Sequence, residues 1–219
     1  MTRTVGIYLF DEAEVLDFAG PFEVFSTASR VKGRLQPGIP KPFEVYTIAD
    51  SIRTVRARGG LMIQPHYDVT NHPHIDVLII PGGVVTSELQ RETIIDWIAR
   101  TAQMSSITAS VCTGAFLLGK AGLLYGKSAT THWEDIADFR AMFPDVNVQS
   151  ETRWVDTDRI VTSAGISAGL DMSLYLVARL EGHDLAVGTA RQMEYDCSIP
   201  VRRIGVSAVT PGYSCRFTG

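Results

Sequence analysis

The chain has 219 residues, of which 45% are hydrophobic and 20% are charged, and its 20 basic and 24 acidic side chains leave a net charge of −4. This composition is typical of a folded globular protein and excludes an intrinsically disordered chain. The acidic balance argues against a nucleic-acid binder, and the sequence lacks the apolar run of ~20 residues that a membrane-spanning helix needs.

Strand and helix patterns alternate along the chain. A strand is expected over 4–10, followed by a helix that opens at Asp17 and holds Pro21 in its first turn. Residues 31–42 are rich in proline and glycine and are expected to form a loop that covers or reshapes a pocket. The other expected strands are 43–49, a hairpin of 52–58 with 61–64, 75–80, 106–111, 147–150, 153–156 and 160–162. The other expected helices are 88–103, 115–122, 135–142, 168–180 and 183–195.

This alternation predicts an α/β fold with a mainly parallel central sheet. Residues 75–80 are continuously apolar, as in a central strand that is covered on both faces. We expect a single domain over 1–196 and an irregular tail over 197–219, which is too short for a DNA-binding module. The sequence therefore predicts no nucleic-acid partner and no membrane association.

Three cysteines are present, and only Cys112 sits between an expected strand and an expected helix. A helix N-terminus favours the thiolate, which is the nucleophilic form of cysteine. From position alone, Cys112 is either such a nucleophile or a small buried core side chain. Cys197 and Cys215 are expected to be incidental thiols. The absence of paired cysteine motifs and of a signal-peptide pattern predicts a cytoplasmic protein.

Two further loops follow expected strands and should meet Cys112 at the carboxyl edge of the sheet. After the strand 75–80, the amides of Gly82 and Gly83 are expected to form an anion-stabilising hole with the amide of Thr113, although Pro-Gly-Gly is also common in plain turns. After the first strand, Asp17 is either a helix N-cap or a carboxyl group that holds a proton beside the thiolate. In the second role Asp17 is a general acid, for which Glu12, Glu14 and Glu23 are rivals.

The histidines are less informative. His132 could reach the same pocket, but a histidine beside a tryptophan is more often a packed and hydrogen-bonded side chain. His66, His72 and His74 are clustered in the sequence, yet no carboxylate spacing supports a metal site there. The sequence therefore predicts neither a metal nor an organic cofactor.

Several motifs occur together in a specific order. They are Asp17–Pro21, Pro81–Gly83, Val111–Ala115, Ala121–Leu124, Ala129–Trp133 and Gly165–Asp171. The ordered set resembles the ThiJ/PfpI superfamily, a class I glutamine-amidotransferase-like group, and within it most of all the isocyanide hydratases. The resemblance extends from Val5 to about Tyr195.

This resemblance implies a flavodoxin-like three-layer sandwich that forms a homodimer. It implies Cys112 as the nucleophile and Asp17 as its acid–base partner, because the hydratases have an aspartate where many relatives have a glutamate. Thr113 follows the cysteine as in the hydratases, whereas relatives with glyoxalase-like or protease-like chemistry usually have a histidine there. The resemblance also places four residues near the substrate: Gly82, Gly83, His132 and Ile166.

The implied reaction is the hydration of an isocyanide, a small molecule, to an N-formamide through a thioimidate on Cys112. Two alternatives remain. One is a non-catalytic sensing or dimerising module like that of AraC-type regulators, which carry the domain in front of a helix-turn-helix module. The other is a different cysteine-dependent enzyme of the superfamily, such as a deglycase, glyoxalase or amidase.

Overall fold

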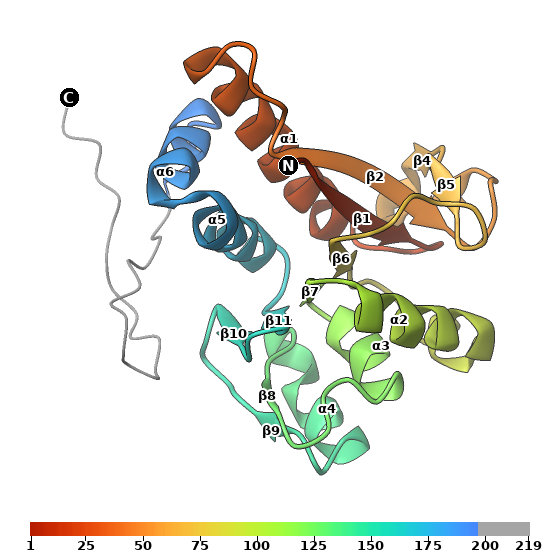
Figure 1. Cartoon of the computed structure of the whole chain (residues 1–219). Helices are drawn as coiled ribbons and strands as arrows, with labels where there is room; N and C mark the ends of the chain where they lie inside the picture. The colour runs from red at the N-terminus through yellow and green to blue at the C-terminus, as the bar shows by residue number, and fades with distance from the viewer. Residues whose placement is uncertain (197–219) are drawn as a thin grey trace.

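The computed structural model describes residues 1–196, and the tail over 197–219, with Cys197 and Cys215, lies outside the described residues (Figure 1). Its main sheet has seven strands in the order β10-β11-β7-β6-β1-β2-β5. All neighbouring pairs in this sheet are parallel except β10 with β11. These strands are β1 (Arg3–Leu9), β2 (Phe43–Ala49), β5 (Tyr67–Asp68), β6 (Val77–Ile80), β7 (Ile107–Val111), β10 (Trp154–Asp156) and β11 (Ile160–Ser163).

The central strands are built for burial on both faces. Every residue of β6 and β7 is buried, in agreement with the continuous apolar run that predicted the first of them. The five parallel strands β2-β1-β6-β7-β11 have the order typical of a flavodoxin-like sheet. The predicted α/β fold with a mainly parallel central sheet is therefore confirmed.

Helices cover both faces of the sheet (Figure 1). The chain leaves β1 in one direction and β6 in the other, and right-handed crossovers therefore put the following helices on opposite faces. One layer contains α1, α5 and α6, which pack against one another, and the other contains α2 and α3. The helices are α1 (Val15–Leu35), α2 (Glu92–Met104), α3 (Gly114–Lys120), α4 (Ile136–Met142), α5 (Ala168–Glu181) and α6 (His183–Gln192).

Smaller elements lie at the edges. The predicted hairpin is present as the antiparallel pair β3 (Val55–Arg56) and β4 (Met62–Ile63). A second short pair joins β8 (Ser128–Ala129) to β9 (Asn147–Val148). Three 3-10 turns complete the described part, namely η1 (Arg58–Gly60), η2 (Glu88–Gln90) and η3 (Trp133–Asp135).

The first helix and the loop after it differ from the prediction. α1 begins at Val15, so Pro21 lies in its second turn, where its missing N–H leaves the carbonyl of Asp17 without its helical donor. The helix also continues to Leu35, so only 36–42 form the loop. This loop enters β2 at the amino end of the strand, where the amide of Arg3 donates to the carbonyl of Pro42 at 2.8 Å. It therefore lies at the opposite edge of the sheet from Cys112 and cannot cover that pocket.

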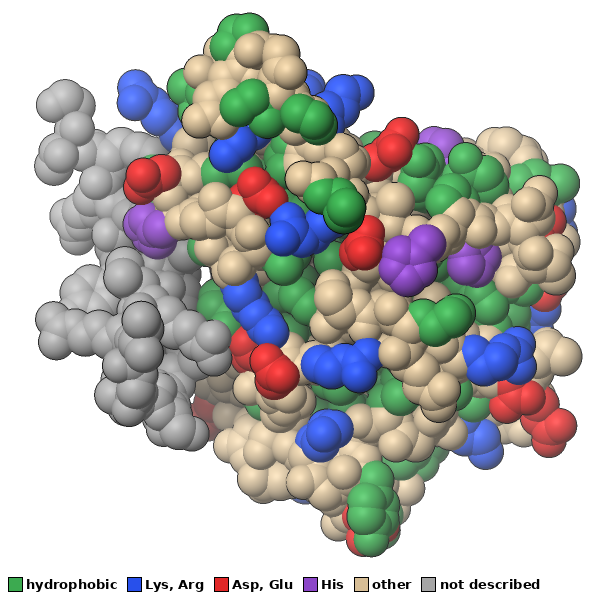
Figure 2. Space-filling view, in the orientation of Figure 1, with side chains coloured by type: hydrophobic (Ala, Val, Ile, Leu, Met, Phe, Trp, Pro, Cys, Tyr) green, Lys and Arg blue, Asp and Glu red, His purple; other side chains and the backbone are tan. Residues whose placement is uncertain are grey.

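Charged side chains of both signs are interspersed on the face shown in Figure 2. Among residues 1–196, no helix combines the length and the apolar character that crossing a bilayer requires.

Candidate active site

The three predicted loops meet at the carboxyl edge of the sheet. β1 and β6 are neighbours, and the chain leaves them in opposite directions, which opens a crevice at this topological switch point. The segment after β1 and the segment after β6 are joined by backbone hydrogen bonds: Glu14 N donates to Gly82 O at 2.8 Å, and Val84 N donates to Glu12 O at 3.1 Å. These bonds fix the start of α1, and with it Asp17, against the Pro-Gly-Gly turn.

Cys112 occupies the sharp turn between β7 and α3. Its φ of 57° lies in the left-handed region, which costs a residue with a side chain roughly 1–2 kcal/mol. Hydrogen bonds hold this conformation, since Cys112 N donates to Ser163 O at 3.1 Å and the hydroxyl of Thr131 donates to Cys112 O at 2.9 Å. The residue is buried, with 7% of its surface exposed. A strained, well-supported turn of this kind is typical of a nucleophile elbow.

Position 82 has room for no side chain larger than that of glycine. A Cβ atom there would stand 2.7 Å from the Cβ of Cys112 and 2.7 Å from the amide nitrogen of Thr113. The next residue, Gly83, has a φ of 139°, and a Cβ on it would stand 2.3 Å from the carbonyl oxygen of Glu12. The backbone of the Pro-Gly-Gly turn therefore packs directly against the cysteine and against the segment that precedes α1.

Asp17 is the carboxyl group that the fold brings to Cys112. It is fully buried, and its Oδ2 accepts a hydrogen bond from Gly82 N at 3.0 Å. The other carboxyl oxygen is buried without a hydrogen-bond partner among the described residues. The three sequence rivals are less suited to this role, because Glu12 is exposed, Glu14 pairs with Arg58 at 3.4 Å and Glu23 pairs with Arg30 at 2.6 Å. The N-cap interpretation of Asp17 is wrong, since the cap residue is Glu14.

Burial sets the protonation of the pair. Burial raises the pKa of Asp17 to about 7, although the hydrogen bond from the Gly82 amide acts to lower this pKa. Burial, followed by the charge of Asp17, raises the pKa of the Cys112 thiol to about 12. The Thr113 amide and hydroxyl lower the pKa of the thiol but do not outweigh burial. Both shifts favour a thiol over the thiolate expected from the helix N-terminus, beside a carboxyl group that titrates near neutrality.

The predicted anion hole is also wrong in its donors. Gly82 N–H is used by Asp17, and Gly83 N–H donates to the Thr113 hydroxyl oxygen at 2.9 Å. The Thr113 hydroxyl in turn donates to Gly83 O at 2.9 Å. Thr113 thus fixes the turn with its side chain, and its own amide is the backbone donor that faces the sulfur.

The other two predicted residues lie at the rim. Ile166 has a φ of 54°, unusual for a β-branched residue, and its amide faces Asp17 and lowers the pKa of that carboxyl. The ring of His132 packs against Gly165, where an added Cβ would stand 2.0 Å from it. Its Nδ1 lies 3.4 Å from Asp135 Oδ2 and 3.7 Å from Glu134 Oε2. His132 is therefore brought to the rim, with no hydrogen bond to the cysteine in the described part.

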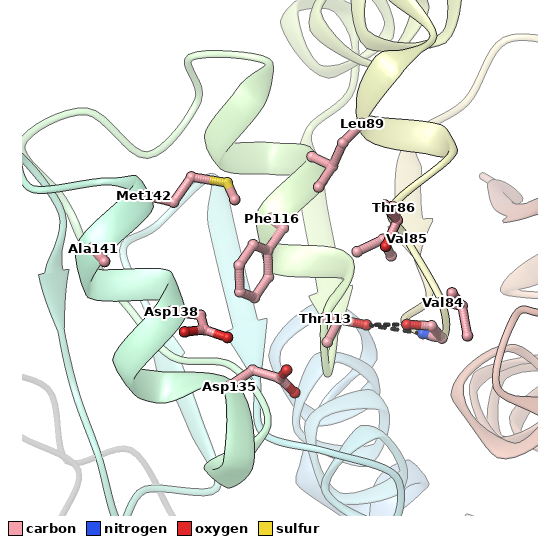
Figure 3. Close-up of a pocket in the computed structure, with 11 residues that line it drawn as sticks. Val84, Val85, Thr86, Leu89, Thr113, Phe116, Asp135, Asp138, Ala141 and Met142 are labelled. Atoms are coloured by element: carbon pink, nitrogen blue, oxygen red, sulfur yellow. Dashed lines mark hydrogen bonds between the residues drawn. The ribbon is translucent and has the colours of Figure 1, made fainter.

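An open groove adjoins the site on the other side of Thr113 (Figure 3). Its volume is about 560 Å³, and it is lined by the segment 83–89 on one side, by α3 with Thr113 before it, and by α4 with Asp135 before it on the other. Asp135 and Asp138 project into it from the α4 side, and Phe116 lies between them and Leu89. The groove thus begins at the residue that follows the nucleophile.

Sequence reasoning missed two residues of this region. Thr131 supports the strained Cys112 backbone, and its motif was recognised, but only its neighbour His132 was considered. The charge of Asp135 raises the pKa of the Cys112 thiol, although the two residues are far apart in sequence and no motif joins them. Among residues 1–196, no group of three histidine, cysteine, aspartate or glutamate side chains is arranged to hold a metal ion.

Comparison with known proteins places this geometry in a family. The family model described as the DJ-1/PfpI family matches residues 3–179, and these residues contain the three loops and the cysteine elbow. The chain belongs to the DJ-1/PfpI family. The ThiJ/PfpI resemblance predicted from the ordered motifs is confirmed.

Individual relatives within the DJ-1/PfpI family differ in function. An isonitrile hydratase from Pseudomonas putida is 32% identical over 197 residues, which cover 89% of this chain and 79% of that protein. The HTH-type transcriptional regulator GbdR from Pseudomonas aeruginosa is 28% identical over 89% of this chain, but the chain spans only 51% of that regulator. A crystal structure of a ThiJ/PfpI family protein from Pseudomonas syringae superposes with a TM-score of 0.78 at 27% identity, covering 94% of this chain and 80% of that one. The DJ-1/PfpI fold therefore carries both enzymes and regulators.

Proposed function

We propose that this protein is an isocyanide hydratase that uses Cys112 as nucleophile and Asp17 as its acid–base partner. The observation that carries the proposal is the buried pair at the strained turn, in which a carboxyl group that titrates near neutrality faces a thiol. An enzyme that must move a proton both to and from one group gains most when the pKa of that group is close to the working pH. The similarity to the isonitrile hydratase from Pseudomonas putida supports the same substrate class.

The first half of the proposed reaction forms a covalent intermediate. The Asp17 carboxylate takes the thiol proton as the sulfur of Cys112 attacks the terminal carbon of R–N≡C, which is electrophilic. The same proton then passes from Asp17 to that carbon. The product is a thioimidate, R–N=CH–S–Cys, and Asp17 is a carboxylate again. The intermediate divides one difficult addition into two easier steps.

Water completes the cycle. Asp17 removes a proton from water as its oxygen adds to the thioimidate carbon, and the nitrogen receives that proton. The hydroxyl proton returns through Asp17 to the sulfur as the C–S bond breaks, which releases R–NH–CHO and the free thiol. The atoms balance with isocyanide and water alone, and no electrons are transferred.

The thiol must be reduced for this chemistry, so we place the protein in a reducing compartment such as the cytoplasm. We also propose a homodimer, with a small molecule and not a nucleic acid as the ligand. Three exposed apolar side chains border the site and support burial by a second copy: Val84 at 47%, Trp133 at 75% and Ile166 at 39% exposure.

Hydration of p-nitrophenyl isocyanide, followed by absorbance, tests the proposed activity. Cys112→Ala should lower kcat/KM by about 10³-fold or more, since removing a nucleophile abolishes the covalent route. A Cys197→Ser/Cys215→Ser double variant is the matched control and should keep the activity. For the wild type, kcat/KM should rise with pH through about 7 as Asp17 ionises. Equal rates for the wild type and Cys112→Ala would disprove the hydratase.

The regulator-like alternative predicts a different result. A sensing module binds its ligand without turnover, so the same assay would show no formamide although the ligand still protects the protein from thermal unfolding. The observation that supports this alternative is the similarity to GbdR, which extends over about half of that regulator. A deglycase or amidase would instead release product from a glycated amine or an amide and leave the isocyanide unchanged.

A further inference from the structure

The groove beside Thr113 combines an apolar floor with acidic side chains. Phe116, which is 5% exposed, contributes an aromatic surface. Met142, which is 51% exposed, contributes a polarisable thioether. Asp135 and Asp138 lie on the α4 side of this surface (Figure 3). The groove therefore presents negative charge next to apolar area.

The two carboxylates are not neutralised by strong cations. Within residues 1–196, no lysine or arginine nitrogen comes within 4.0 Å of Asp135 or Asp138. Of the residues that the structure describes, one basic side chain lies within 4.0 Å of these carboxylates: His132 Nδ1 is 3.4 Å from Asp135 Oδ2, and it is also 3.7 Å from Glu134 Oε2. Some carboxylates elsewhere in the described part are paired with a guanidinium, as Asp11 is with Arg53 at 2.9 Å. The groove thus retains an uncompensated acidic character.

The groove is also coupled to the nucleophile. Thr113 lines its inner end, and the Thr113–Gly83 hydrogen bonds form the boundary between the groove and the buried pair. The charge of Asp135 also makes a small contribution to the raised pKa of the Cys112 thiol, behind burial and Asp17. A molecule whose reacting end is at Cys112 could therefore extend its remaining part into the groove.

We propose that this groove binds the positively charged, apolar part of a small-molecule ligand, so that the protein prefers organic cations to neutral or anionic compounds. The proposal deepens the hydratase function and rests on it for the reacting end of the molecule. An ammonium group near Asp135 and Asp138 gains from their charge, and its apolar body covers Phe116. An anionic ligand would meet two like charges.

Calorimetric binding to Cys112→Ala protein tests the groove without turnover. The probes are N-[4-(trimethylammonio)phenyl]formamide and its neutral isostere N-(4-tert-butylphenyl)formamide, which differ in charge but hardly in shape. At low salt the cation should bind about five-fold more tightly, the size expected for two partly exposed charge contacts. In an Asp135→Asn/Asp138→Asn background the ratio should fall to about one. Asp184→Asn on α6, which changes the net charge of the protein by one unit away from the groove, should leave the ratio unchanged.

Equal binding of the two probes to the parent protein, no binding of either, or a preference that survives in the double variant would each overturn the proposal. So would light scattering in which the double variant changes only the association of two copies, because the groove would then be covered by a second chain. Failure of the hydratase is distinguishable from these outcomes. If no isocyanide is hydrated but the cation preference and its loss persist, the groove stands and the hydratase does not.

Discussion

The buried pair at Cys112 and the open groove beyond Thr113 share one residue and differ in almost everything else. Around Asp17 and Cys112, backbone groups fix the positions of the reacting atoms, and Gly82 leaves no space for a single added carbon. In the groove, most of the lining residues are at least partly exposed. Atoms that must transfer a proton need fixed positions, whereas a surface that selects among ligands needs accessible area and charge. Changes in stability should therefore be large in the first region and small in the second.

The largest effect is expected at Gly82. Gly82→Ala places a methyl group 2.7 Å from the Cβ of Cys112 and the Thr113 amide, so the backbone must shift. We expect unfolding free energy to fall by about 3 kcal/mol, as for an overpacked core, together with loss of hydration. Denaturant unfolding measures the change in unfolding free energy. Gly33→Ala, a helical glycine with nothing within 4 Å of the added carbon, is the control and should be neutral or slightly stabilising. Equal effects at both positions would contradict the close packing.

Asp17→Asn should stabilise the protein at high pH. The folded-state pKa of Asp17 is raised to about 7 from a usual value of 3.8, so the wild type loses stability as pH rises between these values. Asparagine removes this cost, and we expect a gain of about 2 kcal/mol at pH 8, allowing for a weaker contact with Gly82.

Near pH 3 the same Asp17→Asn variant should differ from wild type by less than about 0.5 kcal/mol, because Asp17 is then largely protonated in both folded and unfolded chains. Thermal unfolding at the two pH values measures the difference. A pH-independent difference would mean that Asp17 ionises normally. Hydration should be lost in this variant at both pH values, which separates its role in the reaction from its effect on stability.

A smaller effect is expected at Thr113, the residue common to both regions. Thr113→Val keeps the shape of the side chain but removes both hydrogen bonds to Gly83, one donated and one accepted at 2.9 Å. We expect a loss of about 1–2 kcal/mol in unfolding free energy. Thr113→Ser retains the hydroxyl and should recover most of that loss. If serine and valine behave alike, the hydroxyl does not hold the turn.

The smallest effect is expected in the groove. Asp135→Asn and Asp138→Asn should each change unfolding free energy by no more than about 0.5 kcal/mol, because both side chains are at least partly exposed. They should nevertheless change ligand preference. Burial and the nearby charge of Asp138 both raise the pKa of Asp135, so Asp138→Asn should move that pKa down, which NMR titration of the carboxyl carbon would detect. A large loss of stability in either variant would contradict the contrast between the two regions.

Much of the fold could be predicted from local sequence patterns. The apolar run Ile75–Ile80 predicted a central parallel strand, and the pattern 106–111 followed by Cys112 predicted a turn at the carboxyl edge of the sheet. These predictions succeeded because burial on both faces requires an uninterrupted apolar sequence. The boundaries of α1 were less accessible, since Pro21 is tolerated in its second turn and 31–35 continue the helix despite the glycine within them.

The sequence by itself determined the order of strands and helices, the cysteine at a strand-to-helix turn, and the small residues that let three loops approach one another. Only the tertiary structure decided what those groups do there. It assigned the Gly82 and Gly83 amides to Asp17 and Thr113, selected Asp17 among four acidic residues, and raised the pKa values of the thiol and the carboxyl. It also placed Asp135 where its charge acts on the pKa of the cysteine. Local propensity acts over a few residues, whereas burial and charge act through space between segments far apart in the chain.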